Sequence, residues 1–240
     1  MQMPCQPNEG KSLTIDTAFG THERHPIRTH VIMKEDTPES VLDTYVTPYL
    51  QQGDVIFVSE KIIAIMQGRA FPVDEIKPSR LARLLCKFVY KPDYGIGIGS
   101  PVTMELCVRE VGRVKIIFAA LIAGFCKLFG KRGVFYNICG MKARAIDGPC
   151  DYTLPPYNKY AKMAPHKPDS VAAKLAKHTG HDVYIVDAND IACTVLGKSS
   201  KTLDSAFAEL IFSDNPLGQS SEQTPIAIIR KVEENTNETL

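Results

Sequence analysis

The sequence predicts a mixed α/β or α+β protein, in which mixed sheets are flanked by helices. Segments with helical spacing alternate with strand-like segments along the chain. The stretch from Gly53 to Arg69 is the most informative, because a Gly-Asp turn leads into a β-branched and aromatic run that is typical of a buried strand. At Ser59, Glu60 and Lys61 the chain becomes polar, where the strand gives way to the next element.

A length of 240 residues fits one large domain or two small ones. We therefore expect a single unit over residues 1–240, which could divide into subdomains of about 1–150 and 151–240. No internal repeat is visible.

The remaining elements follow from the spacing of the apolar residues and from the residues that begin or end helices and strands. We expect strands at 13–15, 27–33, 182–187 and 225–231, and helices from Thr37 to before Pro48 and at 80–89, 103–111, 169–179 and 205–212. The apolar segment from Val114 to Ile138 is expected to hold core strand, with a buried helix over 116–129 as the alternative. Residues 147–168 are rich in Pro, Tyr and Asp, and we expect a loop there.

Composition excludes several classes of protein. The formal net charge is +1, which disfavours a nucleic-acid or membrane-surface protein. Seven cysteines without a Cys-x-x-Cys pair indicate reduced thiols, neither a disulfide framework nor a zinc site. The N-terminus lacks the apolar core of a signal peptide, and the run from Ile116 to Cys126 is shorter than the ~20 residues of a membrane helix. We expect a soluble cytoplasmic protein.

Asp187 is the best single candidate for chemistry. It ends an apolar strand, and a carboxylate at the carboxyl end of a strand can hold a divalent cation together with phosphate oxygens. The alternative is an Asp that bonds its own turn. Glu60 and Lys61 follow another strand, where they could contact a phosphate or a metal or form an ordinary solvated strand end.

Three loops are further candidates. The segment 218–223 could wrap a nucleotide. The segment 137–147 carries Lys142, Arg144 and Asp147, and its two basic side chains suit an anionic substrate or a phosphoryl group. A solvated surface loop is the alternative for both. The glycines of 95–101 match neither the Rossmann nor the Walker spacing, so a flexible connection is favoured. No Gly-x-Ser-x-Gly elbow occurs, which disfavours a serine hydrolase.

Three separated segments together resemble the gamma-glutamyl ligases that add glutamate to the deazaflavin coenzyme F-420. They are 53–69 with the downstream Pro78-Ser79, then Pro155-Pro156 through the following helix to Asp187-Ala188-Asn189, and Gly218-Gln219 with the strand 224–230. Their shared order carries the resemblance, which spans the chain from about Gly53 to Arg230.

The resemblance implies an enzyme of the gamma-glutamyl-ligase fold that uses GTP and Mg²⁺ or Mn²⁺ to activate a carboxylate as an acyl phosphate, which the amino group of glutamate then attacks. Metal ligands would be Asp187 and Gln219, with Asp147 as a third if it folds back beside Asp187. The residues implied to bind the nucleotide are Glu60, Lys61, Gly218, Gln219, Ser220, Ser221 and Glu222. A small-molecule acceptor and a homodimer are also implied, with no nucleic-acid or membrane partner.

The sequence departs from the family's pattern at several positions. The family's Asn-Ala-Gly-Ile-Asp is replaced by residues 137–141, which lack the Asp, and Ile65 replaces a common lysine. Gln67 replaces a common Glu, and Ala188 follows the expected metal ligand in place of a hydroxyl residue. The alternatives to a ligase are a non-catalytic protein of the same fold that binds a small anion or nucleotide, and a metal-dependent phosphotransferase or hydrolase.

Overall fold

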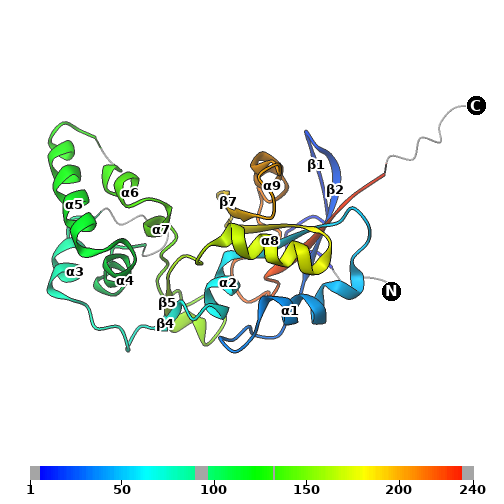
Figure 1. Ribbon diagram of the computed structural model, residues 1–240, viewed down its shortest axis with the longest axis horizontal. Coiled ribbons are helices and arrows are strands. Elements are labelled where there is room, and N and C mark those ends of the chain that lie inside the picture. The colour runs from blue at the N-terminus through cyan, green and yellow to red at the C-terminus, as the bar shows by residue number, and fades with distance from the viewer. Residues whose placement is uncertain (1–5, 90–96, 132, 234–240) are drawn as a thin grey trace, which may run out of the picture. The chain divides into compact units, whose positions relative to one another are not determined.

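The computed structural model describes residues 6–89, 97–131 and 133–233, and its chain divides into two compact units (Figure 1). The first unit holds residues 1–66 and 166–240, and the second holds residues 67–165. The chain thus leaves the first unit after Met66 and returns to it at His166, whereas the sequence suggested one boundary near residue 150.

The first unit is built on a six-stranded sheet in the order β1-β2-β8-β3-β6-β7. Its strands are β1 (Thr14–Thr17), β2 (Gly20–Ile27), β3 (Val55–Ser59), β6 (Asp182–Ala188), β7 (Cys193–Lys198) and β8 (Ile226–Lys231). The neighbours β3 and β6 are parallel, whereas all other neighbouring pairs of this sheet are antiparallel. The expected mixed sheet with flanking helices is therefore confirmed.

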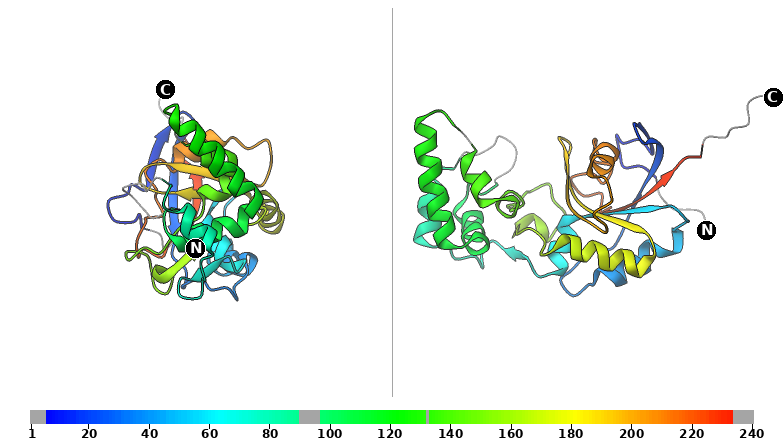
Figure 2. Two further views of the ribbon diagram at one scale, coloured as in Figure 1. Left: turned by 90° about the vertical axis from the view of Figure 1, so that its left-hand side faces the viewer. Right: turned by 45° about the horizontal axis from the view of Figure 1, so that its top comes forward.

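Helices cover both faces of this sheet (Figure 2). Helix α9 (Ser205–Ile211) packs over one face, where Phe57 stacks on Tyr184 and Phe212 with ring centroids 4.8 and 4.4 Å apart. Helices α2 (Glu60–Met66) and α8 (Pro168–Thr179) contact the strands from the other face, and α1 (Pro38–Tyr45) packs on α8. A short 3-10 helix, η1 (Thr47–Tyr49), follows α1.

The second unit contains a two-stranded sheet and a set of helices. The strands are β4 (Ala70–Pro72) and β5 (Tyr160–Lys162), and the helices are α3 (Arg80–Leu85), α4 (Pro101–Val111), α5 (Arg113–Leu128), α6 (Val134–Cys139), α7 (Met141–Arg144) and the 3-10 helix η2 (Tyr157–Lys159). Its core is centred on Met104, Leu106 and Ile116, none of which is exposed.

Most expected elements form, and capping explains two of them. Thr37 and Ser40 cap each other at the start of α1, and Ser100 and Thr103 do the same at the start of α4. The expectation of a strand at 27–33 was wrong, because β2 runs earlier and ends at Ile27. The N–H of Arg24 donates to Leu13 on the β1 side, so the nitrogen of Pro26, two residues on, also faces away from β8. Its missing N–H costs no sheet hydrogen bond, since Pro26 lies beyond the last residue of β2 that pairs with β1.

The expectation of core strand within Val114–Ile138 was also wrong. The segment forms α5 and α6, so the alternative of a helix over 116–129 is confirmed, although α5 is buried only at Ile116 and Ala119. Short apolar runs fit strand and helix alike, so the pattern could not decide. Part of the expected glycine-rich connection, Gly95 and Ile96, lies outside the described residues. None of the helices in the described residues is long and apolar enough to cross a membrane.

Candidate functional site

The residues that the sequence singled out in the first unit meet at one edge of the six-stranded sheet. Ser59 pairs with Val186 in the parallel strands β3 and β6, so Glu60 and Asp187 follow these two residues at the same edge. Strand β8 runs in the opposite direction and begins there, with Ile226 opposite Val58. The chain that precedes β8, including 218–223, therefore reaches the edge at which β3 and β6 end. In α/β sheets, ligands bind beyond the carboxyl ends of parallel strands.

Glu60 and Lys61 lie differently at this edge. Glu60 opens α2 and is 2% exposed, whereas Lys61 is half-buried. The backbone N–H of Lys61 donates to the Ser59 hydroxyl at 3.4 Å, and the Ser59 N–H donates to the Pro225 carbonyl at 2.9 Å. The second bond joins the last residue of β3 to the residue that precedes β8.

Asp187 is partly exposed near the end of β6. Side chains alternate along a strand, and Tyr184 and Val186 belong to the aromatic core under α9. Asp187 therefore lies on the opposite face of the sheet, which carries α2 and α8. Burial raises the pKa of the nearby Cys193 thiol to about 12, and the negative charge of Asp187 adds to that shift.

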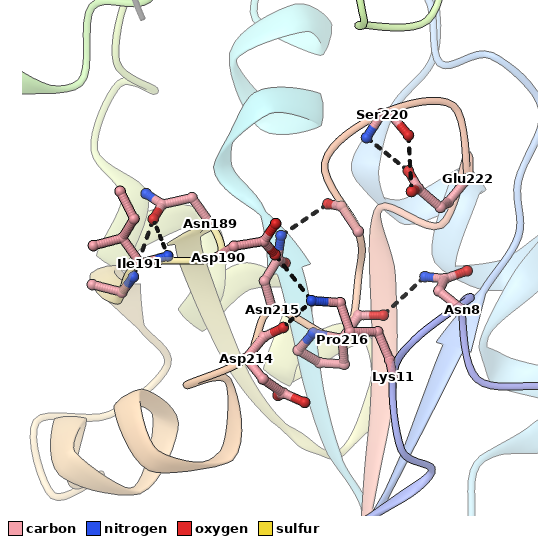
Figure 3. A network of polar contacts seen from close by, with 12 residues as sticks. Asn8, Lys11, Asn189, Asp190, Ile191, Asp214, Asn215, Pro216, Ser220 and Glu222 are labelled. Atoms are coloured by element: carbon pink, nitrogen blue, oxygen red, sulfur yellow. Dashed lines mark hydrogen bonds and ion pairs between the residues drawn. The ribbon is translucent and has the colours of Figure 1, made fainter. Parts of the chain in front are cut away.

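The 218–223 loop is held in shape by its own carboxylate (Figure 3). Glu222 accepts hydrogen bonds from the Ser220 N–H at 2.8 Å and the Ser220 hydroxyl at 2.9 Å. Gly218 has φ of +76°, and a Cβ at this position would lie 2.5 Å from the Glu222 side chain. The buried Asn215 donates to the Gly218 carbonyl at 3.0 Å. This arrangement leaves Gln219, Ser220 and Ser221 exposed at the tip.

Gln219 reaches the turn that follows Asp187. Its side chain approaches Asp190 and helps to lower the pKa of that carboxylate. Asn189 holds the turn by accepting from the N–H groups of Ile191 at 2.9 Å and Ala192 at 3.0 Å. The two distant segments that the sequence singled out, 187–190 and 218–222, thus lie close together.

Lys11 is a residue of this edge that sequence reasoning missed. Its ammonium group donates to the Asp190 carboxylate at 2.9 Å and to the Asp214 carbonyl at 2.5 Å (Figure 3). The hydrogen bond from Lys11 lowers the pKa of Asp190 below its ordinary value, and the approach of the Gln219 side chain acts in the same direction. The polar segment before β1 has no periodic pattern, so nothing in the sequence indicated that it reaches this edge.

Asn8 and Arg24 fix the segment before β1 and the chain that precedes β8 to the sheet. Asn8 donates to the Pro216 carbonyl and to the Thr224 hydroxyl, both at 2.8 Å. Arg24 of β2, which is 1% exposed, holds Asp214 with both terminal nitrogens and also donates to the Ser12 carbonyl at 2.8 Å. The cation of Lys11 is therefore presented from a fixed backbone.

Asp147, the third expected metal ligand, belongs to the second unit. Its carboxylate accepts from the Gly148 N–H at 3.0 Å, and its backbone pairs with Lys162. The basic residues near it have protein partners, since Lys142 pairs with Glu110 at 3.0 Å and Arg144 donates to Asn137 at 2.6 Å. The grouping of Asp147 with Asp187 stays a prediction.

The oxygen donors at the edge where β3 and β6 end fit a cation that is held partly by phosphate oxygens. Within the described residues, no three His, Cys, Asp or Glu side chains form a group that could hold a metal ion alone. Asp187 and Gln219 nevertheless offer oxygen donors, and Mg²⁺ is commonly bound by one or two carboxylates together with substrate phosphates and water.

No curated protein matches the chain. The model of the family described as F420-0:Gamma-glutamyl ligase matches residues 26–190, which is more than half of the chain. The match includes β3, α2 and Asp187, whereas Lys11 and the 218–222 loop lie outside it. The chain belongs to the F420-0:gamma-glutamyl ligase family.

Proposed function

We propose that this chain is a nucleotide- and metal-dependent amide ligase that joins an amino acid, glutamate in the first instance, to a carboxylate-bearing acceptor. The observation that carries the proposal is the meeting of Asp187, Gln219 and the 218–222 loop at one sheet edge, in a member of a ligase family. GTP is the expected nucleotide.

The exposed tip of the loop is the proposed contact for the triphosphate. Ser221 offers a hydroxyl group there, whereas the hydroxyl of Ser220 would reach a phosphate oxygen only by exchanging its bond to Glu222. Glu60 and Lys61 lie where β3 ends, at the same edge. Mg²⁺ or Mn²⁺, held by Asp187, Gln219 and phosphate oxygens, would neutralise charge on the phosphates.

We propose that Lys11 supplies the positive charge that other family members supply with a lysine at the position of Ile65. Family members commonly carry a lysine where this chain has Ile65, and Ile65 is 5% exposed in α2. The ammonium group of Lys11 lies beside Asp190 and Gln219, within the proposed phosphate region. Basic groups are useful there because phosphoryl transfer depends on positioning and on neutralising the charge of the transferred group.

The proposed reaction has two steps. The γ-phosphoryl group of GTP passes to the acceptor carboxylate, which gives an acyl phosphate and GDP. The amino nitrogen of glutamate then attacks the acyl carbon, and the amide forms as inorganic phosphate leaves and the nitrogen loses its proton. The roles of the chain's own residues are to hold the triphosphate at the loop and to orient it with Lys11 and Asp187.

A thermal-shift panel tests the nucleotide site. GTP and ATP, each with Mg²⁺ or Mn²⁺, are titrated into the wild type and the D187A, Q219A and K11M variants. A ligand at about 100 times its Kd stabilises the native state by about 2.7 kcal/mol, so GTP with metal should raise the Tm of the wild type clearly. The D182A variant is the matched control, since Asp182 is an exposed carboxylate at the other end of the same strand.

The expected result is a large loss of the metal-dependent shift in D187A and Q219A, with D182A like the wild type. An undiminished shift in D187A contradicts the metal assignment. Mass spectrometry of the product mixture then separates ligation from binding alone: nucleotide binding without an amide product from any carboxylate acceptor tested would favour the non-catalytic alternative. A homodimer is also proposed from the family, and a monomer in light scattering after size exclusion contradicts it.

A further inference from the structure

The outer face of α5 is apolar over its whole length. Its exposed side chains lie at helical spacing and are Val114, Ile117, Phe118, Leu121, Ile122, Phe125 and Leu128, with Phe129 directly after the helix. We call these eight residues the apolar face of α5. Phe118 is 58% exposed, Leu121 69% and Leu128 82%. Figure 1 shows α5 as the long green helix.

The size of this face calls for a partner. The exposed fractions of the eight side chains give a patch on the order of 900 Å², whereas the largest apolar patch of a typical monomer is about 300–600 Å². The inner side of the helix is already used, since Ile116 and Ala119 are buried in the core of the second unit. A helix that is apolar on both sides is normally buried on both sides.

The charges around the face indicate what covers it. No Asp or Glu occurs between Glu110 and Asp147, whereas this interval contains seven Lys and Arg residues. Helical spacing places Arg113 beside Ile117 and Lys115 beside Ile122, so cations flank the apolar face on both sides. Among the described residues, neither Arg113 nor Lys115 has an ion-pair partner.

We propose that the apolar face of α5 lies on an anionic phospholipid surface, in contrast to the expectation of no membrane partner, because the net charge of +1 over the whole chain does not reveal this local excess of cations. An amphipathic helix that carries Phe and Leu on one face and flanking cations inserts that face into the boundary between lipid headgroups and acyl chains. A second copy of this chain is a poorer complement, because a symmetric contact through this face would offer no Asp or Glu from the same interval to pair with Arg113 and Lys115. The helix would rest in the plane of the surface, since it is too short to span a bilayer.

The absence of tryptophan allows a direct test. The F118W variant places the sole tryptophan of the chain on the apolar face, and the L210W variant places it at an exposed apolar position on α9, in the first unit. Each full-length variant is titrated with vesicles of phosphatidylcholine alone and with vesicles that contain roughly 30% phosphatidylserine. Emission should shift to shorter wavelength for F118W with anionic vesicles and stay unchanged for L210W.

Flotation with the same vesicles measures the binding itself. Wild-type protein should float with anionic vesicles, and the R113Q and K115Q variants should each lose roughly fivefold in partitioning, because a cation near such a surface contributes about 1 kcal/mol. The F118Q/F125Q variant should stay in the soluble fraction, with a circular dichroism spectrum that shows it is folded. Both positions are exposed, so this change removes no core contact.

Two results would overturn the proposal. One is equal or absent binding to neutral and anionic vesicles by the wild type. The other is a dimer in light scattering that F118Q/F125Q converts to a monomer while no vesicle binding is seen, which would assign the face to a second copy. Neither result depends on nucleotide, so the proposed ligase function is tested separately.

Discussion

The pair Arg24–Asp214 gives the sharpest prediction about how the site is held together, because its two members are buried very unequally. The Arg24 side chain is 1% exposed, whereas that of Asp214 is 44% exposed. Removing Asp214 leaves a guanidinium group buried without its counter-charge, and breaking buried pairs in this way costs about 3–5 kcal/mol. Because Asp214 is half exposed, we expect the lower end, about 3 kcal/mol, for D214A.

The reverse change should cost less. The R24M variant removes the buried charge and leaves Asp214 free to be hydrated, and its cost is the lost hydrogen bonds to the Ile211 and Ser12 carbonyls, about 1–2 kcal/mol. The double variant should match R24M within about 0.5 kcal/mol, since D214A does no further harm once the cation is gone.

Hydrogen exchange of β2 and α9 amides measures these free energies in the first unit alone, which avoids the assumption that both units unfold together. The pair Lys174–Glu39, whose lysine side chain is 73% exposed, is the control, and K174M should change the opening free energy by less than about 0.5 kcal/mol. Equal costs for D214A and R24M would refute the reasoning from unequal burial.

Three further changes test packing and charge. The G197A variant should lose about 3 kcal/mol of stability, because its Cβ would lie 2.5 Å from the backbone at the start of α8. The G124A variant has open space around the new Cβ and should be as stable as the wild type or more stable. Thermal melts that rank the two variants the other way contradict this. Replacing Phe57, which is fully buried between two stacked rings, with Ala should cost about 4 kcal/mol in urea unfolding, and a loss below about 1 kcal/mol argues against that stack. The K11M variant should raise the pKa of Asp190 toward 3.8 in an NMR titration. Since the folded pKa is lowered, the stabilisation from this pair is present at neutral pH and is lost as the pH falls through that pKa. An unchanged pKa of Asp190 contradicts the contact.

Much of the fold could be predicted because local signals agree with the tertiary structure. The Gly53-Asp54 turn, the buried run to Val58 and the amphipathic pattern of α8 each specify one element, and the structure forms all of them. Strand β7 was not predicted. Its residues include Gly197, which has no strand preference and is needed because α8 approaches closely there.

The candidate site was predictable in part for a similar reason. A carboxylate near the carboxyl end of a buried strand, as Asp187 is, can be located from the pattern of that strand. The contact of Gln219 with Asp190 depends on the antiparallel insertion of β8 between β2 and β3, which no local pattern specifies. The place of Lys11 at this site could not be predicted either, since its partners lie 179 and 203 residues away in the chain.

Paramagnetic broadening by Mn²⁺ with GTP tests the central claim most directly, because it locates the bound complex on the chain. Backbone NMR signals are followed as Mn²⁺ is added to the protein with excess Mg²⁺ and GTP. The account predicts that broadening concentrates at 187–190 and 218–222 and is absent from the turn between β1 and β2. Broadening centred in the second unit, or none at these two segments, would contradict the assignment of this sheet edge as the nucleotide site.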